Sequence, residues 1–87
     1  MLKISYDKNV LKDLDRIPVK DVERIVSIIN GLPVEPFPAK CKKLSTKDKV
    51  YRIRQGNYRV IYTVNQAQQE IRIILVGHRK EIYRELK

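Results

Sequence analysis

Residues 51–62 have the sequence YRIRQGNYRVIY, a pattern that predicts two β-strands joined by a tight turn. Gly56-Asn57 forms a favourable two-residue hairpin loop, because both residues tolerate positive φ. This loop sets the register, and residues directly opposite each other share a face of the sheet. One face therefore collects Arg52, Arg54 and Arg59, and the other collects Tyr51, Ile53, Val60 and Tyr62.

Three like charges on one face of a sheet repel one another, so this arginine face favours an anionic ligand. The alternative is a solvated outer face, because exposed charges are usual on a sheet that is covered on one side only.

The distribution of charge along the chain supports the ligand-binding interpretation. The chain has a formal charge of +9; residues 1–39 carry six basic and six acidic side chains, whereas residues 40–87 carry 13 basic and four acidic ones. Between Lys40 and Arg59 eight basic residues accompany one acid, Asp48. Such a one-sided field attracts polyanions, and nucleic acid is the polyanion it fits best. A membrane surface fits less well, because no segment pairs a basic helical face with a Trp, Phe or Leu face.

Length and composition indicate one domain spanning residues 1–87. No apolar run approaches the roughly 20 residues of a membrane span, and the N-terminus lacks the apolar stretch of a secretory signal. A lone Cys41 excludes an internal disulfide and fits a reducing compartment, so we expect a cytoplasmic protein. With one His and one Cys, we expect no metal site and no cofactor.

Hydrophobic periodicity predicts two helices before the hairpin. Residues 2–6 alternate as a short strand, and Asp7 is a candidate N-cap for a helix that buries Val10, Leu11, Leu14 and Ile17. A second helix runs from Val19 to Asn30, and Asn30-Gly31 is expected to close it. An extended connector containing Pro33, Pro36 and Pro38 follows.

The second half of the chain predicts an antiparallel meander. Its strands are expected at 42–44, 50–55, 58–64 and 71–76; the last is apolar on both faces and therefore interior. Gly77 should break that strand, leaving a short tail with helical character over His78–Lys87. The predicted fold is α+β: an antiparallel sheet of about four strands, with two N-terminal helices packed on one face and the arginine face open.

Three segments together resemble the RelE/ParE toxin superfamily of type II toxin–antitoxin systems, and its RelE branch in particular. They are Lys42-Lys-Leu44, the hairpin 51–62, and Val76-Gly-His-Arg-Lys-Glu-Ile-Tyr-Arg84. The resemblance spans nearly the whole chain and implies the sheet and helices predicted above. It also implies a translation-blocking toxin that cleaves mRNA on the ribosome and is neutralised by a cognate antitoxin protein.

The resemblance implies a metal-free ribonuclease mechanism in which the RNA 2′-hydroxyl attacks the adjacent phosphate, leaving a 2′,3′-cyclic phosphate and a 5′-hydroxyl. This chemistry needs a base, cations for the transition state and an acid for the leaving oxygen. By position in the motif, the matching catalytic residues are Arg52, Arg54, Arg59, Arg79 and Tyr83.

The hairpin departs from the best-known family member, which has lysines where this chain has Arg52 and Arg54. An arginine cannot release its proton at neutral pH, so these two residues are expected to act as electrostatic stabilisers. His78 or Tyr83 would then be the base, or the reaction would rely on charge stabilisation and positioning. The alternative roles are a structural histidine and a core tyrosine.

The lysines before the hairpin are expected to form a nucleic-acid-binding rim: Lys40, Lys42, Lys43, Lys47 and Lys49. Tyr51, Tyr58 and Tyr62 are expected in the core or at the turn, with Phe37 as a plug over the helices. Two other functions stay open: a ParE-like inhibitor of DNA gyrase, and a non-catalytic RNA-binding domain.

Overall fold

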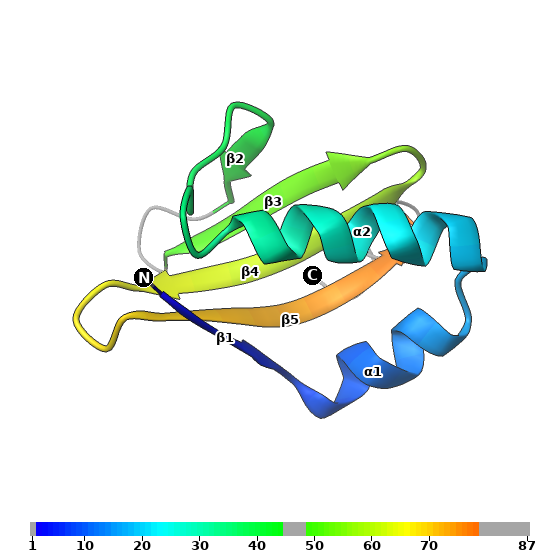
Figure 1. Cartoon of the computed structure of the whole chain (residues 1–87), viewed down its shortest axis with the longest axis horizontal. Helices are drawn as coiled ribbons and strands as arrows, with labels where there is room; N and C mark the ends of the chain where they lie inside the picture. The colour runs from blue at the N-terminus through cyan, green and yellow to red at the C-terminus, as the bar shows by residue number, and fades with distance from the viewer. Residues whose placement is uncertain (1, 45–48, 79–87) are drawn as a thin grey trace.

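Five strands form one mixed sheet in the order β1-β5-β4-β3-β2 in the computed structural model, which describes residues 2–44 and 49–78 (Figure 1). The strands are β1 (Lys3–Tyr6), β2 (Cys41–Lys43), β3 (Val50–Gln55), β4 (Tyr58–Asn65) and β5 (Glu70–His78). All neighbouring strands are antiparallel except β1, which pairs with β5 in parallel. The α+β fold is confirmed, and each of the five predicted strand segments forms a strand of the sheet. The sheet thus has five strands where about four were expected, and it is mixed where an antiparallel sheet was expected.

The hairpin formed by β3 and β4 has the predicted register. Tyr51 lies opposite Tyr62, Ile53 opposite Val60, and Arg54 opposite Arg59. Gly56 has a φ of 58°, in the left-handed region that the first position of such a turn favours for glycine. The short loop therefore sets which side chains share each face of the hairpin.

The two helices, α1 (Lys8–Asp15) and α2 (Val19–Gly31), bury apolar side chains against one face of the sheet. Figure 1 shows α2 lying across the sheet and α1 beside the end of β1. Their buried residues share one core cluster with β3, β4 and β5; the fully buried members include Val10, Ile25, Ile29, Ile53, Val60, Tyr62, Ile71 and Ile73. The face that contains Tyr51, Ile53, Val60 and Tyr62 thus meets the helices, as predicted.

Two local predictions about the helices were wrong, and a third was right in position only. Leu11 is 59% exposed, because α1 turns the stripe Val10, Leu14 and Ile17 inward and Leu11 lies beside it. Asp7 does occupy the N-cap position, but its carboxylate makes no capping bond and instead accepts from Arg72 Nε at 2.9 Å. Gly31 is the last residue of α2 and lacks the positive φ expected of a glycine that caps a helix.

Strand β5 contains a bulge at Ile74. Ile61 pairs with Leu75 whereas Tyr62 pairs with Ile73, so Ile74 is an extra residue on β5. The side-chain amide of Asn9 in α1 donates a hydrogen bond to the Ile74 carbonyl oxygen at 3.1 Å. Beyond the bulge β5 continues through Gly77 to His78, so the prediction that Gly77 ends the strand was wrong. The rest of the predicted tail lies outside the described residues.

Candidate nucleic-acid interface

Strand alternation brings the three hairpin arginines to the face opposite the helices, as predicted. Their burial differs: Arg54 is exposed, Arg52 is half-buried and Arg59 is only 3% exposed. Ile61, which lies on the same face, is fully buried yet belongs to no helix-side cluster. The expectation of a uniformly open arginine face was therefore wrong, because its β4 side is covered and its β3 side is accessible.

The accessible side forms a cleft of about 520 Å³ at the edge of the sheet. Four cationic side chains line it: Arg52 and Arg54 from β3, Lys42 from β2 and Lys40 from the turn before β2. The other lining residues in the part of the chain that the structure describes are Ala39, Cys41, Gln55 and Gly56. None of these lining residues is acidic. We call this site the basic cleft. Its charge suits a phosphate group that brings two or more negative oxygens.

Pairing between β2 and β3 builds the basic cleft. Lys42 lies opposite Arg52, so both side chains project to the arginine face. Lys43 lies opposite Tyr51, so it belongs to the other face of the same strand. Two adjacent lysines of the predicted rim thus lie on opposite faces, and only Lys42 joins the arginines.

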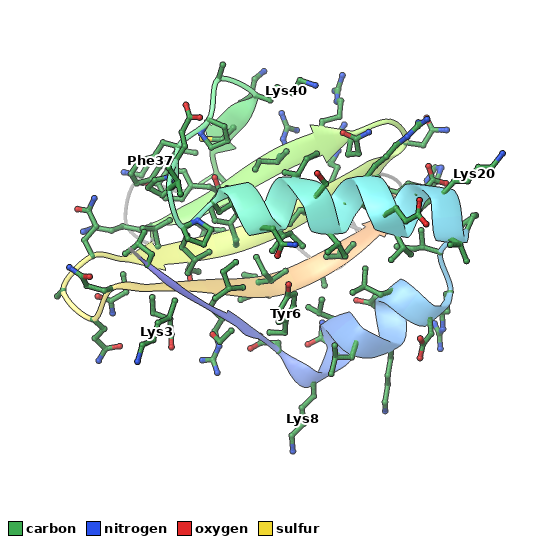
Figure 2. All side chains as sticks on the ribbon, viewed as in Figure 1. Lys3, Tyr6, Lys8, Lys20, Phe37 and Lys40 are labelled. Carbon is green, nitrogen blue, oxygen red and sulfur yellow. The ribbon has the colours of Figure 1, made fainter. Side chains whose placement is uncertain are left out.

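The remaining rim lysines are separated in space. Figure 2 shows Lys40 beside β2, where it lines the basic cleft. Lys49 is exposed immediately before β3 and does not line the cleft. Lys47, together with Arg79 and Tyr83 of the predicted catalytic set, lies outside the described residues.

Arg59 does not line the basic cleft, although it lies opposite Arg54 across the hairpin. On its other side β5 places Gly77 opposite it, and a glycine leaves room for a long side chain on that face. The structure therefore does not bring the three arginines into one cavity. Arg52 and Arg54 share the cleft, whereas Arg59 is buried on the neighbouring strand, β4.

His78 lies on the helix-covered face and is separated from the arginines by the sheet. It pairs with Tyr58, and the two rings meet edge to face with centroids 5.8 Å apart. Both line a second cavity of about 290 Å³, together with Val76 and Gly77 of β5, Asp13 of α1, and Arg16 and Ile17, which follow α1. In this arrangement His78 cannot share a phosphate with Arg52 and Arg54.

An aromatic stack fixes the proline connector that leads into the basic cleft. Tyr51 packs on Tyr62 with ring centroids 5.8 Å apart, and Phe37 packs on Tyr51 at 4.9 Å. The Tyr62 hydroxyl donates to the Pro36 carbonyl oxygen at 2.8 Å. Tyr62 is fully buried and Tyr51 is half-buried against the core, in line with the prediction. Phe37 is 42% exposed and packs on the Tyr51 ring.

Burial raises the pKa of Tyr62 well above its ordinary value, and a side-chain hydrogen bond with Cys41 raises it further. The hydroxyl therefore stays protonated and remains a donor to Pro36 throughout the physiological range. Since Cys41 begins β2, these contacts hold both the connector and β2 against the hairpin. The sequence did not point to Cys41, Ala39 or Gln55 as residues of the site, because none of them carries charge.

Among residues 2–44 and 49–78, no group of three or more His, Cys, Asp or Glu side chains is arranged to hold a metal ion. In the same part of the chain, no helix has the length and apolar character needed to cross a membrane.

Comparison with known proteins identifies a family that covers nearly the whole chain. The family model for the ParE toxin of type II toxin–antitoxin systems (parDE) matches residues 4–83. The toxin RelE3 of Methanocaldococcus jannaschii is 35% identical over 86 residues, covering 94% of this chain and 96% of that protein.

Solved structures give the same result. The RelE–RelB complex of Pyrococcus horikoshii contains a chain that is 34% identical, with a TM-score of 0.81 over 90% of this chain and 94% of that chain. The RelB–RelE antitoxin–toxin complex of Methanococcus jannaschii contains one that is 31% identical, with a TM-score of 0.77 over 100% of both chains. The chain belongs to the ParE toxin family of type II toxin–antitoxin systems, within the RelE/ParE superfamily.

Proposed function

We propose that residues 1–87 act as a RelE-type toxin domain, a ribosome-dependent endoribonuclease that cuts mRNA in the cytoplasm and so stops translation. The observation that carries this proposal is the convergence of Lys40, Lys42, Arg52 and Arg54 in one cleft, with no acidic side chain among its described lining residues. Attack of a 2′-hydroxyl on the adjacent phosphate concentrates negative charge on the phosphoryl oxygens. Fixed cations that meet this charge favour the transition state over the ground state.

Within this proposal the cleft residues have distinct roles. Arg52 and Arg54 are held by β3 and offer planar, permanently charged donors to the non-bridging oxygens. Arg59 is buried on β4 opposite Arg54, and from there it adds positive electrostatic potential to the arginine face. Arg79 and Tyr83 retain the catalytic roles that the family motif implies. His78 lies on the other face, so we do not retain it as the base.

Expression of this chain alone should arrest growth through loss of translation, and mRNAs should be cut at positions occupied by ribosomes. Mapping mRNA 5′ ends after induction tests this expectation, and the new ends should carry a 5′-hydroxyl. The family model is named for ParE, so gyrase inhibition is the competing function. Intact mRNA accompanied by double-strand breaks in DNA would exclude the ribonuclease and support that alternative.

We further propose that the partner is a cognate antitoxin that neutralises the chain by covering the basic cleft. An apolar groove of about 320 Å³ adjoins the cleft, and Ala39, Lys40 and Gln55 line both cavities. The other groove residues are Ile28, Pro38 and Ile53. An extended or helical segment could therefore place an apolar side chain in the groove and acidic side chains over the cleft.

Antitoxin association should slow as salt rises, because complementary charge mainly affects the rate of encounter. Lys40→Glu should slow it further, whereas Lys20→Glu, at the far end of α2, should have a much smaller effect (Figure 2). The antitoxin can be co-expressed with the chain and then separated from it, and stopped-flow mixing of the two proteins measures the association rate. Association rates that do not depend on salt or on Lys40 would contradict a partner that covers the cleft.

A further inference from the structure

The proposed cleavage needs a proton for the departing 5′-oxygen, and the arginines of the cleft cannot supply it. An alkoxide is a poor leaving group unless it is protonated as the bond to phosphorus breaks. Guanidinium groups hold their protons too strongly to act as acids at neutral pH. Alkylammonium groups are also charged at neutral pH, but they can give a proton to the far more basic alkoxide.

Among the cleft-lining residues of segments 2–44 and 49–78, Lys40 and Lys42 are the only side chains with this property on the arginine side. Cys41 also lines it, but it lies opposite Ile53 and packs against the helix-side core. Lys40 lies in the turn before β2, whereas Lys42 is held within β2 directly opposite Arg52. The Cβ atoms of such opposed residues are roughly 5 Å apart, so both side chains can reach the same phosphate.

We propose that Lys42 is the catalytic proton donor to the 5′-oxygen, an inference that rests on the proposed ribonuclease function. The 2′-oxygen forms a bond to phosphorus while its proton passes to water in the cleft. The bond from phosphorus to the 5′-oxygen breaks, and that oxygen takes a proton from the Lys42 ammonium. The products are a 2′,3′-cyclic phosphate and a 5′-hydroxyl, and Lys42 recovers a proton from water.

The test is single-turnover cleavage of mRNA on a programmed ribosome at saturating toxin, using Lys42→Met and Lys42→Arg. Lys42→Met removes both charge and proton, whereas Lys42→Arg keeps the charge and loses only the acid. Both variants should slow cleavage, by about 10²–10⁴, the range of general acid catalysis. Lys20→Met, which removes one positive charge from the exposed start of α2, should cleave at the rate of the unmodified chain (Figure 2).

A second substrate separates proton donation from charge. When sulfur replaces the bridging 5′-oxygen at the cleaved bond, the thiolate leaves without a proton, so both Lys42 variants should recover most of the lost rate. The proposal would be overturned if Lys42→Arg cleaved normal mRNA at the rate of the unmodified chain. It would also be overturned if the slow cleavage by the Lys42 variants persisted on the sulfur-containing substrate. If the unmodified chain itself fails to cut the programmed mRNA, the proposed function fails as well, and the two failures are distinguishable.

Discussion

Replacing Arg54 by alanine should slow cleavage of ribosome-bound mRNA by about 10²–10³, the loss typical of one preorganised electrostatic donor. Arg54 is exposed, lines the basic cleft and is held in β3 next to its last residue, where pairing with Arg59 of β4 fixes its backbone. Because the transition state carries more charge than the ground state at the phosphate, the loss should appear in the rate of the bound complex. Ribosome binding should weaken far less, since Lys40, Lys43 and Lys49 remain to contact phosphates.

Arg24 provides the matched control, because it is an exposed arginine on α2 that lines neither the cleft nor the adjoining groove. Arg24→Ala changes the net charge by the same amount and should leave the single-turnover rate unaltered. Arg54→Lys should recover part of the loss, since it restores charge without the planar fork of donors. If Arg54→Ala cleaves at the original rate once bound, the cleft is only a docking surface.

Tyr62→Ala should lower the free energy of unfolding by about 3–5 kcal/mol, the usual cost of truncating a buried aromatic side chain. The Tyr62 ring is fully buried, stacks on Tyr51 and anchors the connector through its hydroxyl. Urea unfolding followed by circular dichroism measures the change. In a domain of this size, a loss of this magnitude is a large part of the total stability.

Tyr62→Phe separates the hydroxyl from the ring. It keeps the stack and removes the hydroxyl's hydrogen bonds to Pro36 and Cys41, so it should cost about 1–2 kcal/mol. Leu11→Ala, on the exposed side of α1, should change stability by less than about 0.5 kcal/mol. If Tyr62→Phe lowers the free energy of unfolding as much as Tyr62→Ala does, then the hydroxyl tether to Pro36, and not the ring stack, stabilises this region.

The sequence predicted the hairpin correctly, because a two-residue turn containing Gly56 sets the register of both strands through local geometry. The apolar alternation of residues 51–62 then assigned the inner and outer faces. The helices were likewise found because their apolar residues recur with helical spacing. The errors at Leu11 and Gly31 concern single positions. Whether Leu11 is buried depends on how α1 packs on the sheet, and the conformation of Gly31 depends on the direction of the chain after α2.

The basic cleft could not be predicted, because it depends on pairing between segments that the sequence does not link. Cys41–Lys43 has only three residues and little strand character, yet its pairing with β3 places Lys42 beside Arg52 and Lys43 on the opposite face. The parallel pairing of β1 with β5 is also non-local and joins the two halves of the chain. The sequence alternation predicted an exposed Arg59. Its burial depends on the position of β4 between β3 and β5, which the local sequence does not encode.

The bulge at Ile74 divides β5 into two segments, and the face to which odd-numbered residues point changes from one segment to the other. Odd-numbered residues face the helices at Ile71 and Ile73, whereas even-numbered residues do so at Val76 and His78. If the same sequence formed this strand without a bulge, Ile74 would pair with Ile61 and Val76 with Arg59, so every residue after Ile73 would exchange faces. The bulge is therefore the feature that places Gly77, and not a larger side chain, beside the buried Arg59, and that keeps His78 on the helix-covered face.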